Sequence, residues 1–393
     1  MRVRLWLVML LALALVAAAC GDDDDDANGG TGTTGPDAAG ETLKIGFAAD
    51  YGELGEFSDR PATDAMEFVV DQLQAEGADV ELVVKNIDGD PEQTQRAVQE
   101  LLDEGVHVIL GPPFSDFGFP LLTQVDGDVP VIFVASTEYT LADADRCSFL
   151  AAFSDPVQSA AMAEHALDEG LTRAVTFSSP DAPYFEINTE IFTERFQEGD
   201  GETVRDFTFS LADEDFSTQV NAIANLSPPP DVLYTAMVMP QIGTLLGQLR
   251  GAGVELTVLG TDAFDATRVI DAGADAEGVA FASHTFPEPG SELETFLSAY
   301  EASTGSAIET ISFGALAADA LNLAVDASER AGTTEPQAIC DALKETDGFE
   351  GLTGEISYAD TNGVPIKPVF VVRIEGGEAT LVESFAPESV PEP

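Results

Sequence analysis

The sequence predicts an α/β fold class with two doubly wound lobes, each built on a parallel sheet, joined by a hinge of several strands. Short apolar segments alternate with helical segments from residue 43 to residue 136, and the same order starts again near residue 154. Segments that are apolar on both faces and alternate with helices are typical of parallel sheets covered on both sides. A chain of 393 residues is long enough for two such lobes.

The first lobe is expected to begin with residues 43–154. Asp90 is a suitable N-cap, and Pro91 suits the first helical position, where a backbone N–H would be unpaired in any case. The predicted strands are 43–49, 80–87, 106–111 and 130–136. The predicted helices are 59–75, one that opens at Asp90, and one that starts near Asp116.

The second lobe is expected to begin with residues 155–286, where the same alternation recurs without sequence repetition. Its predicted strands are 173–178, 203–209, 231–237, 256–260 and 278–283, and its predicted helices are 154–169, 185–197, 215–226 and 241–251. Residues 287–350, with helices at 291–304, 313–330 and 335–345, are predicted to return to the first lobe. The strand-rich residues 351–393 are predicted to return to the second lobe and form the C-terminal tail.

The first residues are predicted to be a targeting segment and not part of the fold. A short basic start, the apolar run 5–16 and three alanines precede Cys20. Residues 1–20 therefore read as a lipoprotein signal peptide with Cys20 as the lipid anchor, similar to the lipobox of bacterial lipoproteins. The alternative is ordinary cleavage with Cys20 as a passenger. Residues 21–42 carry five consecutive aspartates and little apolar surface, which predicts a disordered acidic tether.

Composition excludes several classes of function. The formal net charge is −55, from 16 Lys plus Arg against 71 Asp plus Glu, and such a surface repels nucleic acid and anionic lipid. The three histidines share no metal-ligand spacing, no Gly-x-Ser-x-Gly elbow is present, and no glycine-rich phosphate loop follows the first strand. We expect no enzyme activity, no cofactor and no metal site.

The stretch 106–116 carries the strongest local signal for a binding site. A buried strand stops at Gly111, and a helix begins within a few residues, with Ser115 at its start. Free backbone N–H groups at a helix N-terminus attract anions, and a serine hydroxyl adds a further donor. From the residues alone, the preferred interpretation of Ser115 is a helix cap, and a cap can also contact a ligand.

Several local patterns, in this order, resemble the branched-chain amino-acid (leucine-binding) type of periplasmic binding protein, fold type I, of ABC transporters. The resemblance covers about residues 43–385. It is carried by Ile45-Gly46, Asp88-Gly89-Asp90-Pro91, Gly111-Pro112-Pro113-Phe114-Ser115, Asp215-Phe216-Ser217, Gly260-Thr261-Asp262 and Ala276-Glu277-Gly278-Val279.

The resemblance implies a ligand site between the lobes, at the carboxyl ends of the strands. Ser115 is similar to the family serine that holds a ligand carboxylate, and Ala135, Ser136 and Thr137 are similar to the loop that completes that site. Tyr184 and Asp262 correspond to second-lobe contacts, with Asp262 facing the ligand ammonium, and Phe57 falls near an aromatic of the first loop.

Other interpretations of these residues stay open. Thr137 could end a strand, Tyr184 could pack within its lobe, and Asp262 could cap a helix starting near Ala266. The sequence also departs from the family: Met237, Val238 or Met239 replaces a tyrosine, Leu150 replaces an arginine, and acids occupy the first loop at Asp50, Glu53 and Glu56. Side-chain specificity is therefore undetermined, as is the bridging of the remaining cysteines, Cys147 and Cys340.

The resemblance implies an exported solute-binding lipoprotein of an ABC importer, lipid-anchored at the outer face of the cytoplasmic membrane. Its two lobes would close over an amino acid or similar small carboxylate or amide, as in a Venus flytrap module. Its expected partners are this ligand and an ABC permease, with the lipid anchor as the membrane contact and a monomeric state. The alternative is a sensing module that presents its closed form to a signalling receptor.

Overall fold

The computed structural model describes residues 41–52, 55–266 and 268–385. The predicted signal peptide, the lipid-anchor candidate Cys20 and nearly all of the predicted tether lie outside the described residues. Within the described ranges, no helix is both long enough and apolar enough to span a bilayer.

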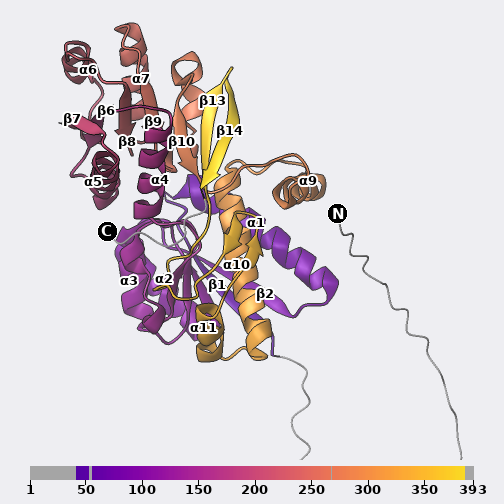
Figure 1. Cartoon of the computed structure of the whole chain (residues 1–393). Helices are drawn as coiled ribbons and strands as arrows, with labels where there is room; N and C mark the ends of the chain where they lie inside the picture. Colours follow the sequence, from indigo (N-terminus) through magenta and orange to yellow (C-terminus); the bar gives the residue numbers. More distant parts are fainter. Residues whose placement is uncertain (1–40, 53–54, 267, 386–393) are drawn as a thin grey trace, which may run out of the picture. The chain divides into compact units, whose positions relative to one another are not determined.

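The first sheet has five parallel strands in the order β2-β1-β3-β4-β5. Figure 1 labels β1 and β2 of this sheet. Its parallel register places Ile45 beside Val108 and Gly111 beside Phe133. The strands are β1 (Leu43–Ala49), β2 (Val80–Asn86), β3 (Val108–Gly111), β4 (Val131–Phe133) and β5 (Ser148–Leu150). The short strand β5 was not expected from the sequence, where its three residues give too brief a pattern.

Helices cover both faces of the first sheet. Alternate residues of β3 point to opposite faces, as the period of a strand requires: Val108 and Leu110 join the core under α1, α10 and α11, and Ile109 joins the core under α2 and α3. The helices and short 3-10 turns of this part are α1 (Glu56–Glu76), α2 (Pro91–Asp103), α3 (Ser115–Val125), η1 (Tyr139–Leu141) and η2 (Ala144–Arg146). The doubly wound arrangement of this lobe is confirmed.

The start of α2 shows how local sequence positions a helix here. The Asp90 carboxylate accepts a hydrogen bond from the Gln93 N–H at 2.7 Å, with Pro91 as the first helical residue. The predicted cap is thus confirmed. Such a cap stabilises a helix by about 1 kcal/mol.

The second sheet has seven strands in the order β14-β13-β10-β9-β8-β6-β7. Five of them are parallel, whereas β13 pairs antiparallel with β10 and with β14, because the chain enters β13 from the opposite direction. The strands are β6 (Arg173–Ser178), β7 (Glu202–Thr208), β8 (Val232–Thr235), β9 (Thr257–Gly260), β10 (Ala280–Ser283), β13 (Val369–Glu375) and β14 (Glu378–Phe385).

Helices also cover both faces of the second sheet. Residues of α4 and α5 pack with β8 and β13 on one side, and residues of α6 and α7 pack with β6 and β9 on the other. The helical elements are α4 (Asp155–Asp168), α5 (Pro183–Glu198), α6 (Ser217–Ala224), α7 (Gln241–Gly251), α8 (Ala263–Ala266) and η3 (Val269–Ala276).

The chain passes between the two lobes three times, through the crossing segments 151–154, 284–291 and 365–368. After the second crossing, α9 (Glu292–Thr304), α10 (Ile311–Ala331), α11 (Pro336–Lys344) and the hairpin β11 (Phe349–Gly351)–β12 (Gly354–Ile356) follow. Ile356 and Tyr358 lie in the first core, and the Tyr358 hydroxyl donates to the Leu150 carbonyl at 2.6 Å. Val364 lies in the core under α2 and α3, and the Leu150 N–H donates to the Gly363 carbonyl at 2.9 Å, so the last segment stays with the first lobe at least to Val364, beyond the expected boundary at residue 351.

Cys147 and Cys340 are joined by a disulfide that links the turn before β5 to α11. Their Cα atoms are 5.5 Å apart although 193 positions separate them in the chain. The bridge therefore fastens the returning helices to the first sheet. Closing a loop of this length stabilises a fold mainly by restricting the unfolded chain.

A buried ionic group lies where the crossing segments meet, and we call Asp319, Thr353 and Lys367 the crossing cluster. The Lys367 ammonium donates to the Ala151 carbonyl at 2.9 Å and to the Thr353 hydroxyl at 2.6 Å. The Asp319 carboxylate accepts from the Thr353 N–H at 2.9 Å and from the Thr353 hydroxyl. This cluster ties the first crossing to the third through α10.

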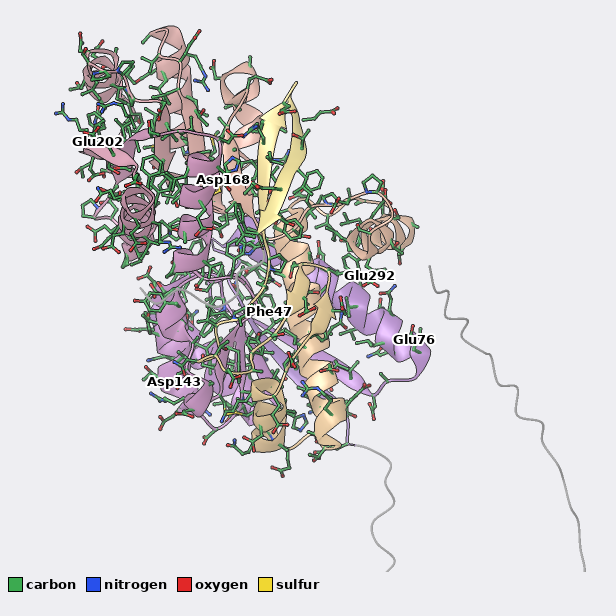
Figure 2. All side chains as sticks on the ribbon, in the orientation of Figure 1. Phe47, Glu76, Asp143, Asp168, Glu202 and Glu292 are labelled. Carbon is green, nitrogen blue, oxygen red and sulfur yellow. A yellow bond between two sulfur atoms is a disulfide. The ribbon has the colours of Figure 1, made fainter. Side chains whose placement is uncertain are left out.

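The acidic residues lie mostly at the surface. Figure 2 shows Phe47 inside the first lobe, whereas Glu76, Glu202 and Glu292 lie on exposed positions. Exposed carboxylates are well solvated, so the large negative charge is compatible with a folded chain.

Candidate functional site

The loops after β3 and β4 form one edge of the first sheet. Val134 N–H donates to the Gly111 carbonyl at 3.3 Å, which holds the two loops side by side. A side chain at position 111 would collide with the Phe133 ring, since an added Cβ would lie 2.5 Å from it. Gly111 is therefore required for the close approach of these two strand ends.

Ser115 is the first residue of α3, and the N-cap is Phe114, which makes no side-chain capping bond. The Ser115 hydroxyl and the N–H groups of Ser115 and Asp116 have no hydrogen-bond partner within the described ranges. The interpretation of Ser115 as a helix cap alone is wrong. A hydroxyl and two free N–H groups converge instead at the helix N-terminus, a combination that attracts anions.

The loop formed by Ala135, Ser136 and Thr137 is buried, and its three N–H groups also have no acceptor in the part of the chain that the structure describes. The backbone of Thr137 contacts the second lobe: its carbonyl accepts a hydrogen bond from the Asp155 N–H at 2.9 Å. Unpaired buried N–H groups are rare in proteins. This loop therefore offers several donors and no charge.

Phe57 lies at the start of α1, 36% exposed. Its ring centroid is 6.5 Å from that of Phe114, the residue before Ser115, and 5.8 Å from that of Phe313 in α10. The structure thus brings Phe57 to the same edge as Ser115, as part of an aromatic group.

Tyr184 and Asp262 meet in the second lobe. The Tyr184 hydroxyl donates to Asp262 Oδ1 at 2.7 Å and lies 2.7 Å from the Thr261 hydroxyl. Tyr184 is the second residue of α5, and Asp262 follows the end of β9, so both occupy the carboxyl edge of the second sheet. Burial, together with the nearby Asp262 charge, raises the pKa of Tyr184 well above its usual value. The phenol therefore stays protonated and donates a hydrogen bond to Asp262.

Asp262 has a second side-chain partner, His284, whose Nε2 lies 3.2 Å from Oδ2. Burial alone would raise the pKa of Asp262, but the hydrogen bond and the electrostatic attraction of His284, together with the hydrogen bond from Tyr184, outweigh it, so the pKa lies below its usual value. Asp262 is therefore an anion at neutral pH, with its side chain 12% exposed.

Asp155, the first residue of α4, extends this network. Asp155 Oδ1 accepts from Gln158 Nε2 at 3.0 Å and from Asn188 Nδ2 at 2.9 Å. Gln158 in turn accepts from the Asp262 N–H at 2.9 Å. Burial raises the pKa of Asp155 to about 7, with the Asp262 charge adding to the rise and Asn188 opposing it. We call Asp155, Gln158, Tyr184, Asn188, Asp262 and His284 the site cluster.

The site cluster contains two carboxyl groups and no lysine or arginine. Within the described ranges, neither Asp155 nor Asp262 forms an ion pair with a Lys or Arg side chain. A buried carboxylate without a cation is costly unless hydrogen bonds or a ligand compensate it. The cluster is thus suited to receive a cationic group, opposite an edge of neutral donors.

Sequence reasoning missed Asp155, Gln158, Asn188 and His284. A signal was present in α4, where Asp155 and Gln158 are one helical turn apart in an alanine-rich helix whose residues 155–163 are all buried. Polar residues at buried positions need partners, and Asn188 similarly follows Tyr184 by one turn.

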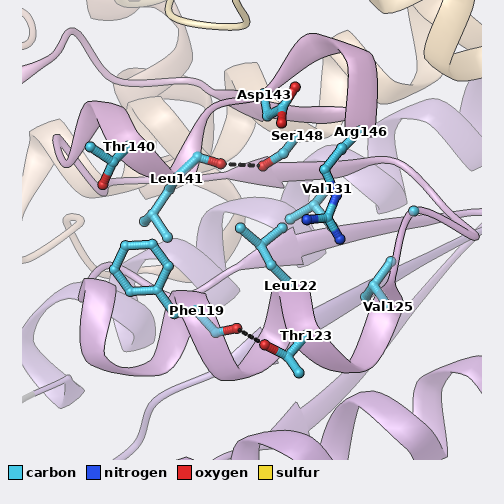
Figure 3. Close-up of a pocket in the computed structure, with 11 residues that line it drawn as sticks. Phe119, Leu122, Thr123, Val125, Val131, Thr140, Leu141, Asp143, Arg146 and Ser148 are labelled. Carbon is cyan, nitrogen blue, oxygen red and sulfur yellow. Dashed lines mark hydrogen bonds between the residues drawn. The ribbon is translucent and has the colours of Figure 1, made fainter.

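A separate cavity of about 250 Å³ lies in the first lobe between α3 and the turns η1 and η2 (Figure 3). Leu122, Leu141 and Arg146 are among the residues that line it, and none of the predicted site residues does. Within the described ranges, no group of three or more His, Cys, Asp or Glu side chains is placed to hold a metal ion.

Comparison with known proteins decides the family. The sequence profile described as periplasmic binding protein matches residues 42–379. The chain belongs to this family. Together with the two-lobed α/β fold, this makes it a solute-binding protein of the branched-chain amino-acid type and not an enzyme. The family also indicates an extracytoplasmic location.

Individual relatives agree with this assignment. A Leu/Ile/Val-binding protein of Rhizobium johnstonii is 22% identical over 352 residues, covering 87% of this chain and 94% of the relative. The crystal structure of a leucine binding protein from Thermotoga maritima is 27% identical, with a TM-score of 0.77, and covers 88% of this chain and 99% of that protein. A solute binding protein of an ABC transporter from R. palustris, in complex with benzoate, has a TM-score of 0.74 at 19% identity and covers 90% of this chain and 98% of that one.

Proposed function

We propose that this chain is the extracytoplasmic, lipid-anchored binding component of an ABC importer and that it binds an amino acid between its lobes. The observation that carries the proposal is the contrast between the two edges. The first lobe offers unpaired neutral donors at Ser115 and at residues 135–137, and the second lobe offers the anion Asp262. A ligand with a carboxylate at one end and an ammonium at the other satisfies both.

In this proposal Ser115, Thr137 and the free N–H groups bind the carboxylate. Hydrogen bonds to a charged group are about twice as strong as neutral ones. Asp262, oriented by Tyr184, binds the ammonium, and Phe57 contacts the ligand side chain. Contacts from both lobes are complete only when the lobes close, so the ligand shifts the population toward closure. A permease would recognise that closed form.

The relatives supply the first ligands to test. The names of two similar proteins specify leucine or Leu/Ile/Val, and a structural neighbour is in complex with benzoate. The melting temperature of the mature protein should therefore be followed with amino acids, amides and short carboxylates. A ligand at a hundred times its Kd adds about 2.7 kcal/mol to the free energy of unfolding. If nothing in this panel shifts melting, the proposed ligand class is wrong.

The role of Ser115 has its own test. Ser115→Ala should raise the Kd of a bound amino acid about tenfold or more, because a hydrogen bond to a carboxylate is lost. Thr123→Ala, which removes a hydroxyl bonded to the Phe119 carbonyl further along α3, is the matched control and should leave the Kd unchanged. Equal Kd values for Ser115→Ala and the unaltered protein would remove Ser115 from the site.

The anchor and the monomeric state are separate parts of the proposal. Cys20 lies outside the described residues, and its support is the small-residue run before it. Cys20→Ser should release the protein from the membrane fraction, and mass spectrometry of the unaltered protein should find a lipid on this cysteine. Retention of Cys20→Ser in the membrane would contradict the anchor. Size-exclusion chromatography should give the mass of one chain.

A further inference from the structure

His284 is a residue that the carboxylate-and-ammonium scheme does not use. It follows β10 at the start of the second crossing segment and is 2% exposed. Its Nε2 faces Asp262 Oδ2 at 3.2 Å, while its Nδ1 is buried and has no hydrogen-bond partner among the described residues. The ring stacks on Phe153 of the first crossing segment, with centroids 3.9 Å apart and an angle of 24° between planes.

These contacts determine the tautomer. Because Asp262 is an anion, the imidazole must present a proton on Nε2 to it. A second proton on Nδ1 would be buried without an acceptor, which costs free energy. The neutral tautomer with hydrogen on Nε2 is therefore the one that fits. Burial lowers the pKa of His284 further than Asp262 raises it, in the same direction as this geometric argument.

We propose that His284 is a positioning residue that orients Asp262, as a neutral donor, for the ammonium group of the ligand. The inference deepens the proposed function and rests on it. Tyr184 binds Oδ1 and His284 binds Oδ2, so the carboxylate plane is fixed by two donors from different elements. Because both donors are uncharged, Asp262 keeps its negative charge for the ligand. An arginine or lysine in the place of His284 would compete with the ammonium.

Acid pH should weaken this arrangement. A proton added to Nδ1 makes His284 a cation beside Asp262 and cancels the charge that the ammonium needs. The other charged groups that face His284 are Asp265 of α8 and Lys367 of the third crossing segment. Asp265 is bonded to the Ser283 and Ser312 hydroxyls, and Lys367 belongs to the crossing cluster, so neither replaces Nε2 as a donor to Asp262.

The experiment compares two ligands and three variants by calorimetry. Leucine carries the ammonium, and isocaproate is the same acid without it. His284→Leu should raise the Kd of leucine roughly tenfold and leave the Kd of isocaproate within about twofold. His284→Gln, which keeps an N–H donor but cannot be protonated, should restore leucine binding at neutral pH. His165→Gln removes another buried histidine that pairs with a carboxylate, Glu383, and should change neither Kd.

The pH profile separates orientation from packing. Leucine affinity of the unaltered protein should fall by up to tenfold per pH unit below the titration of His284, which lies below its ordinary pKa of about 6.5. His284→Gln should lack this fall. Equal losses for leucine and isocaproate in His284→Leu, no rescue by His284→Gln, or the same pH profile in both proteins would each overturn the inference.

A measurement without ligand keeps the inference separate from the proposed function. The ¹⁵N resonances of the His284 ring, assigned by their loss in His284→Gln, should report the neutral tautomer with hydrogen on Nε2 at neutral pH. In Asp262→Asn that preference should weaken. A cationic ring, or hydrogen on Nδ1, would contradict the role of His284 even if leucine binds. Conversely, failure of both ligands to bind the unaltered protein, with the expected tautomer present, would overturn the proposed ligand class alone.

Discussion

Two buried polar groups in this molecule, the crossing cluster and the site cluster, use charge in opposite ways. In the crossing cluster, Lys367 and Asp319 have opposite charges and share Thr353 as a hydrogen-bond partner. In the site cluster, the two carboxyl groups of Asp155 and Asp262 have Gln158, Asn188 and Tyr184 as hydrogen-bond partners and no Lys or Arg among the described residues. Buried charges of opposite sign compensate each other within the protein, whereas a buried carboxylate without a cation favours a cationic ligand group.

The pKa values of the two groups express the same difference. Burial lowers the pKa of Lys367 to about 8, and Asp319 opposes that shift by attraction. Burial raises the pKa of Asp155 to about 7, and Asp262 adds to that shift by repulsion. The first cluster is therefore a structural link between crossing segments, and the second retains negative charge that favours a cationic ligand group.

The largest expected effect is on stability, from breaking the balanced cluster. Lys367→Met leaves the Asp319 carboxylate buried without its cation and should lower the free energy of unfolding by about 3–5 kcal/mol. Denaturation in urea measures this. The double variant Lys367→Met with Asp319→Asn should recover part of the loss, since no charge is then left unpaired. A loss below about 1 kcal/mol in the single variant would show that the opposite charges of Lys367 and Asp319 do not stabilise the fold.

The next effect concerns Asp155 and depends on pH. The pKa of an aspartate in an unfolded chain is about 3.9, whereas burial raises the pKa of folded Asp155 to about 7. Between these values the folded protein holds a proton that the unfolded chain has lost, so stability falls as pH rises through this window. Asp155→Asn keeps an oxygen that can accept from Gln158 and Asn188 but removes the titration. Its stability relative to the unaltered protein should therefore increase by a few kcal/mol from about pH 4 to above pH 7. A stability difference between the two proteins that does not change with pH would contradict a raised pKa for the buried Asp155 carboxyl.

Asp262→Asn should separate binding from stability. Removing this anion should raise the Kd of leucine by roughly a hundredfold, about 2.7 kcal/mol, because the ammonium loses its charged partner. The free energy of unfolding should fall little, since no buried cation loses a partner. Isocaproate, which has no ammonium, is the control and should bind at least as well as before. A large loss of stability would show that Asp262, like the crossing cluster, mainly stabilises the fold.

The smallest effect distinguishes two helix starts. Asp90→Ala removes a side-chain cap and should cost about 1 kcal/mol. Ser115→Ala removes a hydroxyl that has no partner among the described residues and should change the free energy of unfolding by less than about 0.5 kcal/mol. If thermal unfolding gave the same loss of free energy of unfolding for Ser115→Ala as for Asp90→Ala, Ser115 would stabilise its helix after all.

Sequence patterns predicted the elements that are long or strongly punctuated. The alternation of apolar strands and helices predicted both sheets, and the pair Asp90-Pro91 predicted the start of α2. The short strand β5 was not predicted because three residues give too brief a pattern. The antiparallel direction of β13 was not predicted because the direction of a strand depends on where the chain crosses between the lobes. The sequence did not decide whether Cys147 and Cys340 are bridged, because 193 positions separate them and only the packing of α11 brings them together.

The candidate site was predicted only in part, and the reason is physical. Ser115, Thr137, Tyr184 and Asp262 follow strand ends or begin helices, so the chain order locates them at sheet edges. His284 and Asp155 were missed as site residues because their importance comes from long-range contacts, His284 with Asp262 and Phe153, and Asp155 with Asn188 and Thr137. A buried polar residue gives a warning in the sequence but does not identify its partner.

The central claim is that the two lobes hold opposite ends of one small ligand. Calorimetry of the mature protein with leucine, isocaproate and isoamylamine tests it most directly, because the last two each keep one end. The account predicts that leucine binds at least about a hundredfold more tightly than either, since each end contributes a charge-assisted hydrogen-bonded contact. Isocaproate or isoamylamine binding as tightly as leucine would contradict it.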